Sequence, residues 1–455
     1  MRFANRKPEI YIMDEQALNS LEKIRQQFDV APYPRIPLED YPNDMKYLTL
    51  YNIVTAYYLR YKKVVETQER VILDAGCGSG FKSLALAVAN PGAKIVGIDL
   101  SEESVKLAKE RLKYHGIKNV DFYPLSIYDL PKLGIEFHYI HCDDTLYLLP
   151  DIVTGLQAMK SVLKAEGIIR ANLHSLRARI DVFAAQEMFR LMGLMDENPQ
   201  ELEIELVRET MKALKDNVLL KANTWRPEFD RNEERILMNY LFQGDRGYTI
   251  PEMFSALKAA DLEFVSMVNW PQWDLMDLFK EPDDLPMFLG ISLPNLTVEE
   301  RLHLFELLHP IHRLLDFWCA HPNTSAPPSP VAEWTDEDWR GVQVYMHPSL
   351  RVPEVKQQMY ACAIDLKMFE IGRYLAFAKD PTLLIDSTLT AMLLPLLEET
   401  QSIPSLVQNW LQVRPLHPVT LDPIHEQAAF QSVKQLLISL EQIGFVLLEQ
   451  VSSQN

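Results

Sequence analysis

A glycine-rich turn and a downstream acid are the residues of this sequence best suited to ligand chemistry. The stretch VILDAGCGSG at residues 71–80 places Gly76, Gly78 and Gly80 directly after a short apolar run. Glycines let a chain turn sharply from a strand into a helix while its backbone approaches a ligand. Asp99 ends the next apolar run, where a carboxylate can accept hydrogen bonds from both hydroxyls of a ribose. Together the two features predict a nucleoside-binding site.

An acid beside the turn bears on which nucleoside ligand is bound. Asp74 lies two residues before Gly76, and the glycines follow the spacing G-x-G-x-G. Nicotinamide and flavin dinucleotides use the spacing G-x-G-x-x-G, because their pyrophosphate rests on the helix N-terminus. A carboxylate beside the turn would repel a pyrophosphate, whereas it suits a ligand that carries an ammonium and a sulfonium. Both the spacing and Asp74 argue against the alternative interpretation, a nicotinamide-dependent oxidoreductase.

Further polar residues follow two later apolar runs, at the expected carboxyl ends of strands. His141, Asp143 and Asp144 follow one run and His174 follows the other. Ligands bind at the carboxyl ends of strands in open α/β sheets. Asp143 is our first candidate for a contact to a cofactor or to an acceptor substrate, and His174 and His141 are candidates for a base that deprotonates the acceptor. The alternative is that these side chains merely cap strands; a metal site is not expected, because no spacing supplies further ligands.

These residues are positioned by strands that alternate with helices. The patterns predict strands at 71–73, 94–99, 120–123, 137–141 and 168–173, with helices between them. Such alternation indicates a parallel sheet covered on both faces, a doubly wound α/β fold of the Rossmann type. The expected organisation is an N-terminal helical segment (1–70), an α/β domain (71–275) with a helical lid insertion (176–247), and an acidic, mainly helical C-terminal domain (276–455).

Composition restricts the partners and the compartment. The net charge is −18 and no long basic run occurs, so nucleic acid is an unlikely ligand. The four cysteines are far apart and show no zinc spacing. We find neither a signal peptide nor an apolar stretch of membrane-spanning length, and we expect a reduced, cytoplasmic protein. Its oligomeric state is left open.

The glycine motif, Asp99 and the strand-end residues resemble those of class I S-adenosylmethionine-dependent methyltransferases, over residues 70–175 and on to about 275. A PYPR segment at 32–35 resembles one that precedes the core in some bacterial members. The resemblance implies the cofactor S-adenosyl-L-methionine, with Asp99 on the ribose and Ile127 on the adenine edge. Relatives often have an acid where Ser126 stands, so that contact to the adenine amino group differs here. The implied cofactor-binding set is Asp74, Gly76, Cys77, Gly78, Gly80, Asp99, Leu100, Ser126, Ile127 and Cys142.

The implied activity is methyl transfer from S-adenosylmethionine to a small-molecule acceptor. The sequence lacks an Asn-Pro-Pro-Tyr-type motif for amide or exocyclic-amine methylation, which favours an oxygen, carbon or nitrogen atom of a small molecule. A base is needed only if the acceptor must lose a proton. The alternative from another class is a non-catalytic protein that binds S-adenosylmethionine as a sensor or scaffold.

Overall fold

The structure, a computed structural model, describes residues 15–323, 328–376 and 382–450. Residues 1–14 belong to the predicted N-terminal segment, in which no signal peptide is predicted. They lie outside the described part of the chain. Three stretches of the predicted C-terminal domain, 324–327, 377–381 and 451–455, lie outside it as well.

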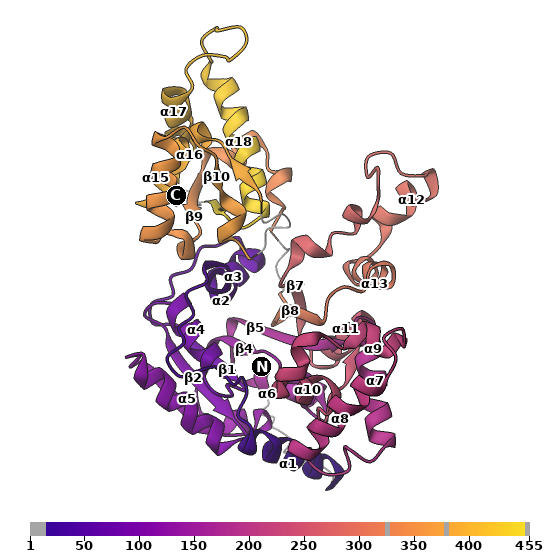
Figure 1. Cartoon of the computed structure of the whole chain (residues 1–455). Coiled ribbons are helices and arrows are strands. Elements are labelled where there is room, and N and C mark those ends of the chain that lie inside the picture. The colour runs from indigo at the N-terminus through magenta and orange to yellow at the C-terminus, as the bar shows by residue number, and fades with distance from the viewer. Residues whose placement is uncertain (1–14, 324–327, 377–381, 451–455) are drawn as a thin grey trace, which may run out of the picture.

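A central sheet confirms the predicted doubly wound α/β fold (Figure 1). Its strand order is β3-β2-β1-β4-β5-β8-β7, with β6 pairing with the end of β5. The first five strands are parallel, as the alternation with helices predicts. The bounds are β1 (Val71–Ala75), β2 (Lys94–Asp99), β3 (Val120–Pro124), β4 (Phe137–Cys142), β5 (Leu163–Ser175), β6 (Gly247–Tyr248), β7 (Glu263–Met267) and β8 (Leu314–Ala320).

Helices cover both faces of the sheet because consecutive residues of a strand point to opposite sides. On β1, Leu73 packs with the cluster that contains α6 and α11, while the neighbouring Ile72 packs with α3 and α4 on the other face. Both residues are fully buried, which explains why the strands are apolar throughout rather than alternating. These helices are α3 (Val54–Tyr61), α4 (Phe81–Ala89), α5 (Glu102–Tyr114), α6 (Ile152–Ser161) and α11 (Ile250–Ala259).

The sheet takes in residues well beyond position 275, where the sequence places the end of the α/β domain. Strand β8 lies between β5 and β7 and is antiparallel to both. The hydrophobic pattern of the sequence did not predict this strand, because Leu314–Ala320 is a short, nearly continuous apolar run. Such a run is found both in buried helices and in buried strands. Between β7 and β8 run α12 (Met287–Ser292) and α13 (Val298–Leu308).

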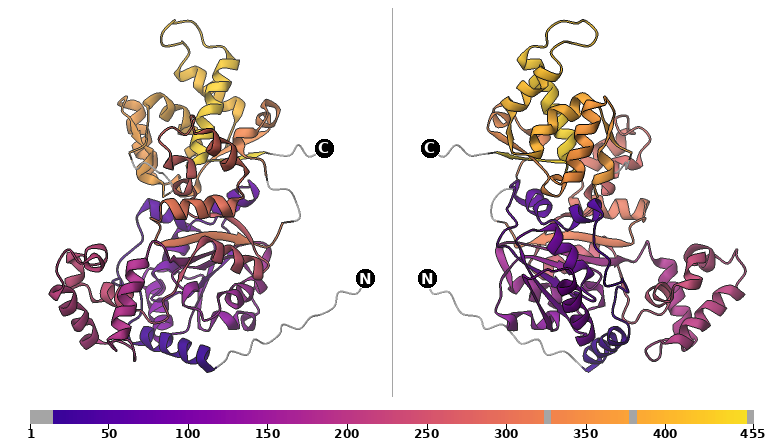
Figure 2. Two further views of the ribbon diagram at one scale, coloured as in Figure 1. Left: turned by 90° about the vertical axis from the view of Figure 1, so that its right-hand side faces the viewer. Right: turned by 60° about the vertical axis from the view of Figure 1, so that its left-hand side comes forward.

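Four helices between β5 and β6 occupy the place of the predicted insertion at 176–247. They are packed around their own apolar cluster, which includes Phe189, Val207 and Tyr240. Figure 2 shows this insertion as a lobe beside the sheet. The loop of the insertion that contains Asp196 contacts the N-terminal helix, because the Lys23 ammonium donates a hydrogen bond to the backbone carbonyl of Asp196 at 2.9 Å. The helices are α7 (Ile180–Leu191), α8 (Glu201–Ala213), α9 (Leu219–Thr224) and α10 (Glu233–Tyr240).

The N-terminal region supplies α1 (Glu15–Val30), α2 (Met45–Tyr51) and α3, and a proline-rich segment (31–37) follows α1. That segment is bound to the glycine turn: Ser79 donates its amide to the carbonyl of Tyr33 (2.8 Å) and its hydroxyl to that of Pro34 (2.7 Å). The guanidinium of Arg111 donates to two further carbonyls of the segment, those of Ile36 and Pro37. The proline-rich segment is therefore a fixed wall against the turn.

The C-terminal domain forms a separate unit with its own core, above the sheet in Figure 1. It is mainly helical, but a three-stranded antiparallel sheet of order β12-β9-β13 holds it together. Tyr58 of α3 joins it to the rest of the protein, because its hydroxyl donates to Glu441 (2.8 Å) and accepts from the amide of Leu448 (3.2 Å). The elements are α14 (Asp336–Arg340), β9 (Val342–Met346), α15 (Pro353–Ile364), β10 (Phe369–Glu370), β11 (Leu384–Ile385), α16 (Ser387–Leu393), β12 (Gln401–Ser402), α17 (Ile403–Val413), α18 (Glu426–Gln442) and β13 (Val446–Gln450).

The described residues contain neither a membrane-spanning helix nor a metal-binding cluster. No helix in them is long and apolar enough to cross a membrane. Nor do His, Cys, Asp and Glu side chains gather there in groups of three or more that could hold a metal ion. The four cysteines are free thiols, and three of them, Cys77, Cys142 and Cys319, are buried.

Candidate functional site

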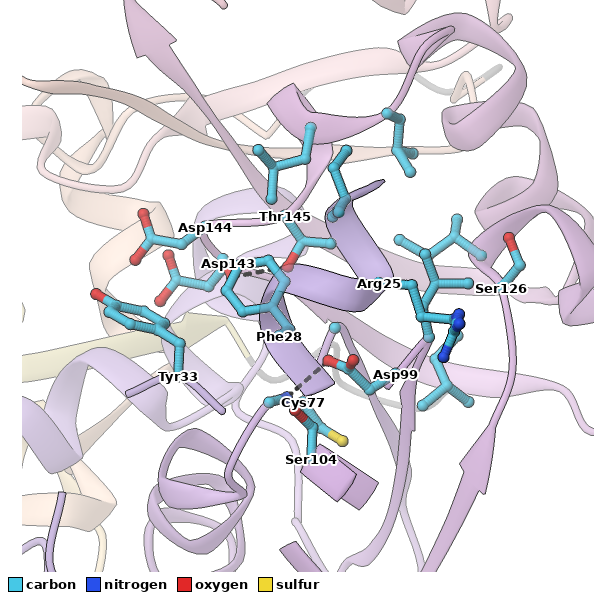
Figure 3. A pocket seen from close by; sticks show the side chains of 18 of the residues that line it. Arg25, Phe28, Tyr33, Cys77, Asp99, Ser104, Ser126, Asp143, Asp144 and Thr145 are labelled. Carbon is cyan, nitrogen blue, oxygen red and sulfur yellow. Dashed lines mark hydrogen bonds between the residues drawn. The ribbon is translucent and has the colours of Figure 1, made fainter. Parts of the chain in front are cut away.

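A cavity lies at the carboxyl ends of β1, β2, β3 and β4. This is the edge of the sheet at which open α/β folds bind ligands. Helix α1 and the proline-rich segment supply part of its wall, through residues such as Phe28 and Tyr33 (Figure 3). The predicted residues that line it are Gly76, Cys77, Gly78, Asp99, Leu100, Ser126, Ile127 and Asp143.

The glycine turn forms the floor of this cavity and is held by the neighbouring strand. The amides of Gly76 and Cys77 both donate to the carbonyl of Ile98 at 2.8 Å. Gly78 has a φ of +48°, and a Cβ placed on it would lie 2.1 Å from the carbonyl oxygen of Tyr33. Any other residue would therefore both strain the backbone and force the proline-rich segment away from the turn.

Asp99 lies in the middle of the cavity, beside the turn (Figure 3). One carboxylate oxygen accepts from the amide of Gly78 and the other from the amide of Ser101, both at 2.9 Å. Burial raises the pKa of Asp99 to about 6, and the two amide hydrogen bonds oppose that rise. The carboxylate is thus oriented by backbone, with lone pairs left to accept hydroxyl groups.

One end of the cavity is largely apolar. Leu100, Leu125 and Ile127 line it, and Ser126 and Arg25 lie at the same end in Figure 3. The hydroxyl of Ser126 accepts from the amide of Tyr128 at 3.3 Å and so caps the short helical turn that follows. This is the end to which the sequence assigns the adenine ring.

The opposite end of the cavity is charged. The Lys82 ammonium lies 2.7 Å from the carboxylate of Asp143 and 3.0 Å from that of Asp144. Figure 3 shows Tyr33 beside these two carboxylates. Asp144 also pairs with the Arg313 guanidinium at 3.4 Å, whose side chain is 53% exposed. A cation between two acids therefore occupies the end at which Asp143 lies, the predicted contact to the cofactor or the acceptor.

The charges of this cluster stabilise one another despite burial. Burial alone would raise the pKa of Asp143, but the cations around it, Lys82 foremost, hold that pKa well below its usual range. Burial alone would likewise lower the pKa of Lys82, but Asp143 and Asp144 raise it above its usual range. Asp143 also accepts from the amide side chain of Asn172 and from the Tyr51 hydroxyl. Asp143 is therefore ionised and held by several donors, which suits a binding contact better than a proton acceptor.

Five predicted site residues do not line the cavity: Asp74, Gly80, His141, Cys142 and His174. Asp74 is 1% exposed and is engaged by the Ser83 hydroxyl (2.5 Å) and by Nδ1 of His141 (3.2 Å). Cys142 is fully buried, and burial raises the pKa of its thiol. These residues support the cavity wall from within, and a direct ligand contact for them stays a prediction.

His174 belongs to a polar cluster next to the charged end. Its Nδ1 lies 2.5 Å from a carboxylate oxygen of Asp245, and its Nε2 lies 3.0 Å from the guanidinium of Arg313. Its ring stacks on Tyr147 with 3.8 Å between the centroids. Burial lowers the pKa of His174, so the ring is neutral at physiological pH, and a neutral ring between these two partners carries its proton on Nδ1.

Sequence reasoning did not single out Lys82 and Asp245 at all, nor Arg313 and Arg25. Lys82 lies in the first turn of the helix after the glycine turn, and that position was the one available signal. Asp245 lies just before β6 and Arg313 just before β8, each at the end of a long connection between strands. No sequence pattern links either residue to β4 or β5. Arg25 reaches the cavity only because α1 folds across it.

Two family models match the chain. One, described as a methyltransferase domain, covers residues 66–240, which include the glycine turn and the cavity-lining strand ends. The other, described as protein-L-isoaspartate(D-aspartate) O-methyltransferase, covers residues 3–124. Both matches include residues 71–99, where the glycine turn and Asp99 lie.

Individual proteins are similar to the chain over different lengths. The uncharacterized protein syc1184_c of Synechococcus sp. is 27% identical over 68% of this chain and 73% of its own. The ribosomal protein L11 methyltransferase of Caldanaerobacter subterraneus is 29% identical over 28% of this chain and 40% of its own. PKMT2 from Rickettsia typhi, solved in complex with AdoHcy, is 16% identical with a TM-score of 0.59, covering 91% of this chain and 78% of that one. The last likeness establishes a shared fold.

Proposed function

Because the chain belongs to the class I S-adenosylmethionine-dependent methyltransferases, we propose that its cavity presents S-adenosylmethionine to a small-molecule acceptor at the charged end. The order of residues along the cavity carries this proposal. Ser126 marks one end, Asp99 the middle and Asp143 the other end (Figure 3). An apolar slot, an acid for the ribose and a charged end for an amino acid suit the parts of this cofactor in sequence.

The chain's own residues hold and orient the reactants. S-adenosylmethionine supplies the electrophilic methyl group when bound. Gly78 and Asp99 would bind the ribose, and the cluster around Lys82 would bind the amino-acid part. Tyr33 and α1 form part of the cavity wall and would therefore exclude water from the bound cofactor. In the best model systems, holding reactants in line contributes about 7–11 kcal/mol to the barrier reduction.

The acceptor would enter between Tyr33 and Asp144. Arg313 is the half-exposed residue beside that end, and Asp144 still keeps part of its carboxylate open. The absence of a long basic run in the sequence supports a small molecule over a nucleic acid as the acceptor.

His174 is the residue we propose as the base for an oxygen or nitrogen acceptor. Asp245 fixes its proton on Nδ1, which leaves the lone pair of Nε2 free to take a proton once Arg313 moves aside. His141 is less suited, because Asp74 engages it and it is fully buried. Asp143 is less suited because Lys82 and Asn172 engage it, so we assign it a contact to the cofactor.

The test is S-adenosylhomocysteine formation with a metabolite extract, followed by the same assay on His174→Gln. We expect turnover by the wild-type protein and a loss of about 10²- to 10⁴-fold in the variant, with unchanged affinity for S-adenosylmethionine. His303→Gln on α13 is the control, since His303 lies outside the cavity lining. The wild-type rate should fall only below about pH 6.5, because the pKa of His174 lies below its usual value and the base must be neutral.

Two results would contradict the proposal. Binding of S-adenosylmethionine without turnover on any fraction of the extract would favour the sensor or scaffold role. Equal rates for His174→Gln and the wild-type protein would remove His174 from the proton transfer while leaving the methyl transfer in place.

A further inference from the structure

The Lys82 ammonium has an unusual position for a lysine in a ligand cavity. It is the second residue of α4, its side chain is 15% exposed, and it lies between the carboxylates of Asp143 and Asp144. All three residues line the cavity at the end opposite Ser126. Without a ligand, the two acids keep this ammonium inside the cavity and hold its pKa above the usual range, so it stays charged.

The amino-acid part of S-adenosylmethionine carries the same two kinds of charge as this cluster, an ammonium and a carboxylate. Two carboxylates face one ammonium in the cavity, which leaves acceptor capacity for a second ammonium. Lys82 would then need a new anion to replace the carboxylate that it gives up. The α-carboxylate of the ligand is such an anion, and the first turn of α4, a nine-residue helix, favours negative charge as well.

On the premise of the proposed function, we propose that Lys82 binds the α-carboxylate of S-adenosylmethionine while Asp143 accepts its α-ammonium. On binding, the ion pair between Lys82 and Asp143 would be replaced by two ion pairs, one between Lys82 and the α-carboxylate and one between Asp143 and the α-ammonium. Each of these four charged groups then has a partner. Asp144 keeps Arg313 as a partner throughout, so the exchange takes place on the Asp143 side. Lys82 is in this way a residue that distinguishes the complete cofactor from adenosine derivatives without an amino-acid part.

Calorimetry with four ligands tests the assignment without any turnover. The ligands are S-adenosylmethionine, S-adenosylhomocysteine, decarboxylated S-adenosylmethionine, which keeps the ammonium, and 5′-methylthioadenosine, which lacks the amino-acid part. We expect Lys82→Met to lower affinity for the first two by about tenfold to a hundredfold, the range of a charged hydrogen bond. The same variant should bind decarboxylated S-adenosylmethionine at least as tightly as the wild-type protein does, and 5′-methylthioadenosine with unchanged affinity.

The matched control is Lys82→Arg, which keeps the charge and should keep most of the affinity for S-adenosylmethionine. Equal losses for all four ligands in Lys82→Met would mean that Lys82 only supports the fold, and unchanged affinity for S-adenosylmethionine would place the carboxylate elsewhere. If Lys82→Met does not fold, the wild-type protein still decides, because it should bind decarboxylated S-adenosylmethionine at least tenfold more weakly than the complete cofactor. A wild-type protein that binds none of the four would instead overturn the proposed function.

Discussion

The two ends of the cavity are built in different ways. At the end proposed to hold the adenosine part, called the adenosine end below, the backbone of the glycine turn and the side chain of Asp99 come from one stretch of the chain, residues 71–101, and are joined by amide hydrogen bonds. At the end proposed to hold the methionine part, called the methionine end below, Lys82 meets Asp143 and Asp144, and Arg313 lies directly before β8. One end is fixed by local backbone, and the other depends on buried charges from distant segments.

This difference determines which amino-acid substitutions each end of the cavity can tolerate. The backbone site at Gly78 tolerates no added side chain, because a Cβ there would meet main-chain atoms of Tyr33. A buried charge cluster tolerates changes of shape, but removal of one partner leaves another charge without compensation. Substitutions at the adenosine end should therefore act through space and geometry, and those at the methionine end through charge.

The largest effect is expected for Gly78→Val. Its Cβ would lie 2.1 Å from the carbonyl oxygen of Tyr33 at a φ of +48°, so the turn and the proline-rich segment cannot both keep their places. We expect affinity for S-adenosylmethionine to fall by more than about a hundredfold, equivalent to roughly 2.7 kcal/mol, with the fold retained. Calorimetry and a thermal unfolding curve measure the two quantities.

Gly116→Val is the control for backbone strain. Gly116 also has a positive φ, +72°, but a Cβ there would meet no atom within 4 Å. We expect it to cost about 1–3 kcal/mol of stability and nothing in affinity. If both variants lose affinity equally, the loss at Gly78 reflects general strain and the adenosine end is not the backbone-fixed site described above.

A smaller effect is expected from the titration of Asp99. Burial raises its pKa to about 6, and the ionised carboxylate is the better acceptor for ribose hydroxyls. Affinity for S-adenosylmethionine should therefore increase as the pH rises through 6, by about tenfold between pH 5 and pH 7. Asp99→Asn, which does not titrate, should bind more weakly and without this pH dependence. A pH-dependent Asp99→Asn would assign the titration to the charges at the other end.

The local sequence pattern predicts the fold as far as β5, after which the strands are separated by long connections. The strands from Val71 to Leu173 and the ribose acid follow from apolar runs, glycines and a strand-end carboxylate within one βαβ unit. Strand β8 could not be placed, because its apolar run has no distinctive period and its partners are distant in the sequence: Ile168 of β5 pairs with Ala320, and Glu263 of β7 pairs with the same residue. The C-terminal sheet was missed for the same reason, since β9 pairs with the distant β13, Met346 with Val446.

The candidate site divides along the same line. Gly78 and Asp99 both line the cavity, and their contact to the ribose stays a prediction. Lys82 was overlooked because a lysine in a helix's first turn is ordinarily an exposed residue, and only the folded sheet brings Asp143 to it. Asp74 shows the converse: its spacing suggested a ligand contact, whereas in the structure its carboxylate is engaged by Ser83 and His141.

The smallest effect, and the one that sharpens the comparison most, is expected from Ser126→Asp. Ser126 caps a helical turn, and Asp caps equally well, so the local backbone should not change. The new carboxylate can accept from the adenine amino group, and we expect S-adenosylhomocysteine to bind about three- to tenfold more tightly. S-inosylhomocysteine, which has a carbonyl at that position, should gain nothing. A gain for both ligands would mean that added charge strengthens this end too, and that its contrast with the methionine end is one of degree.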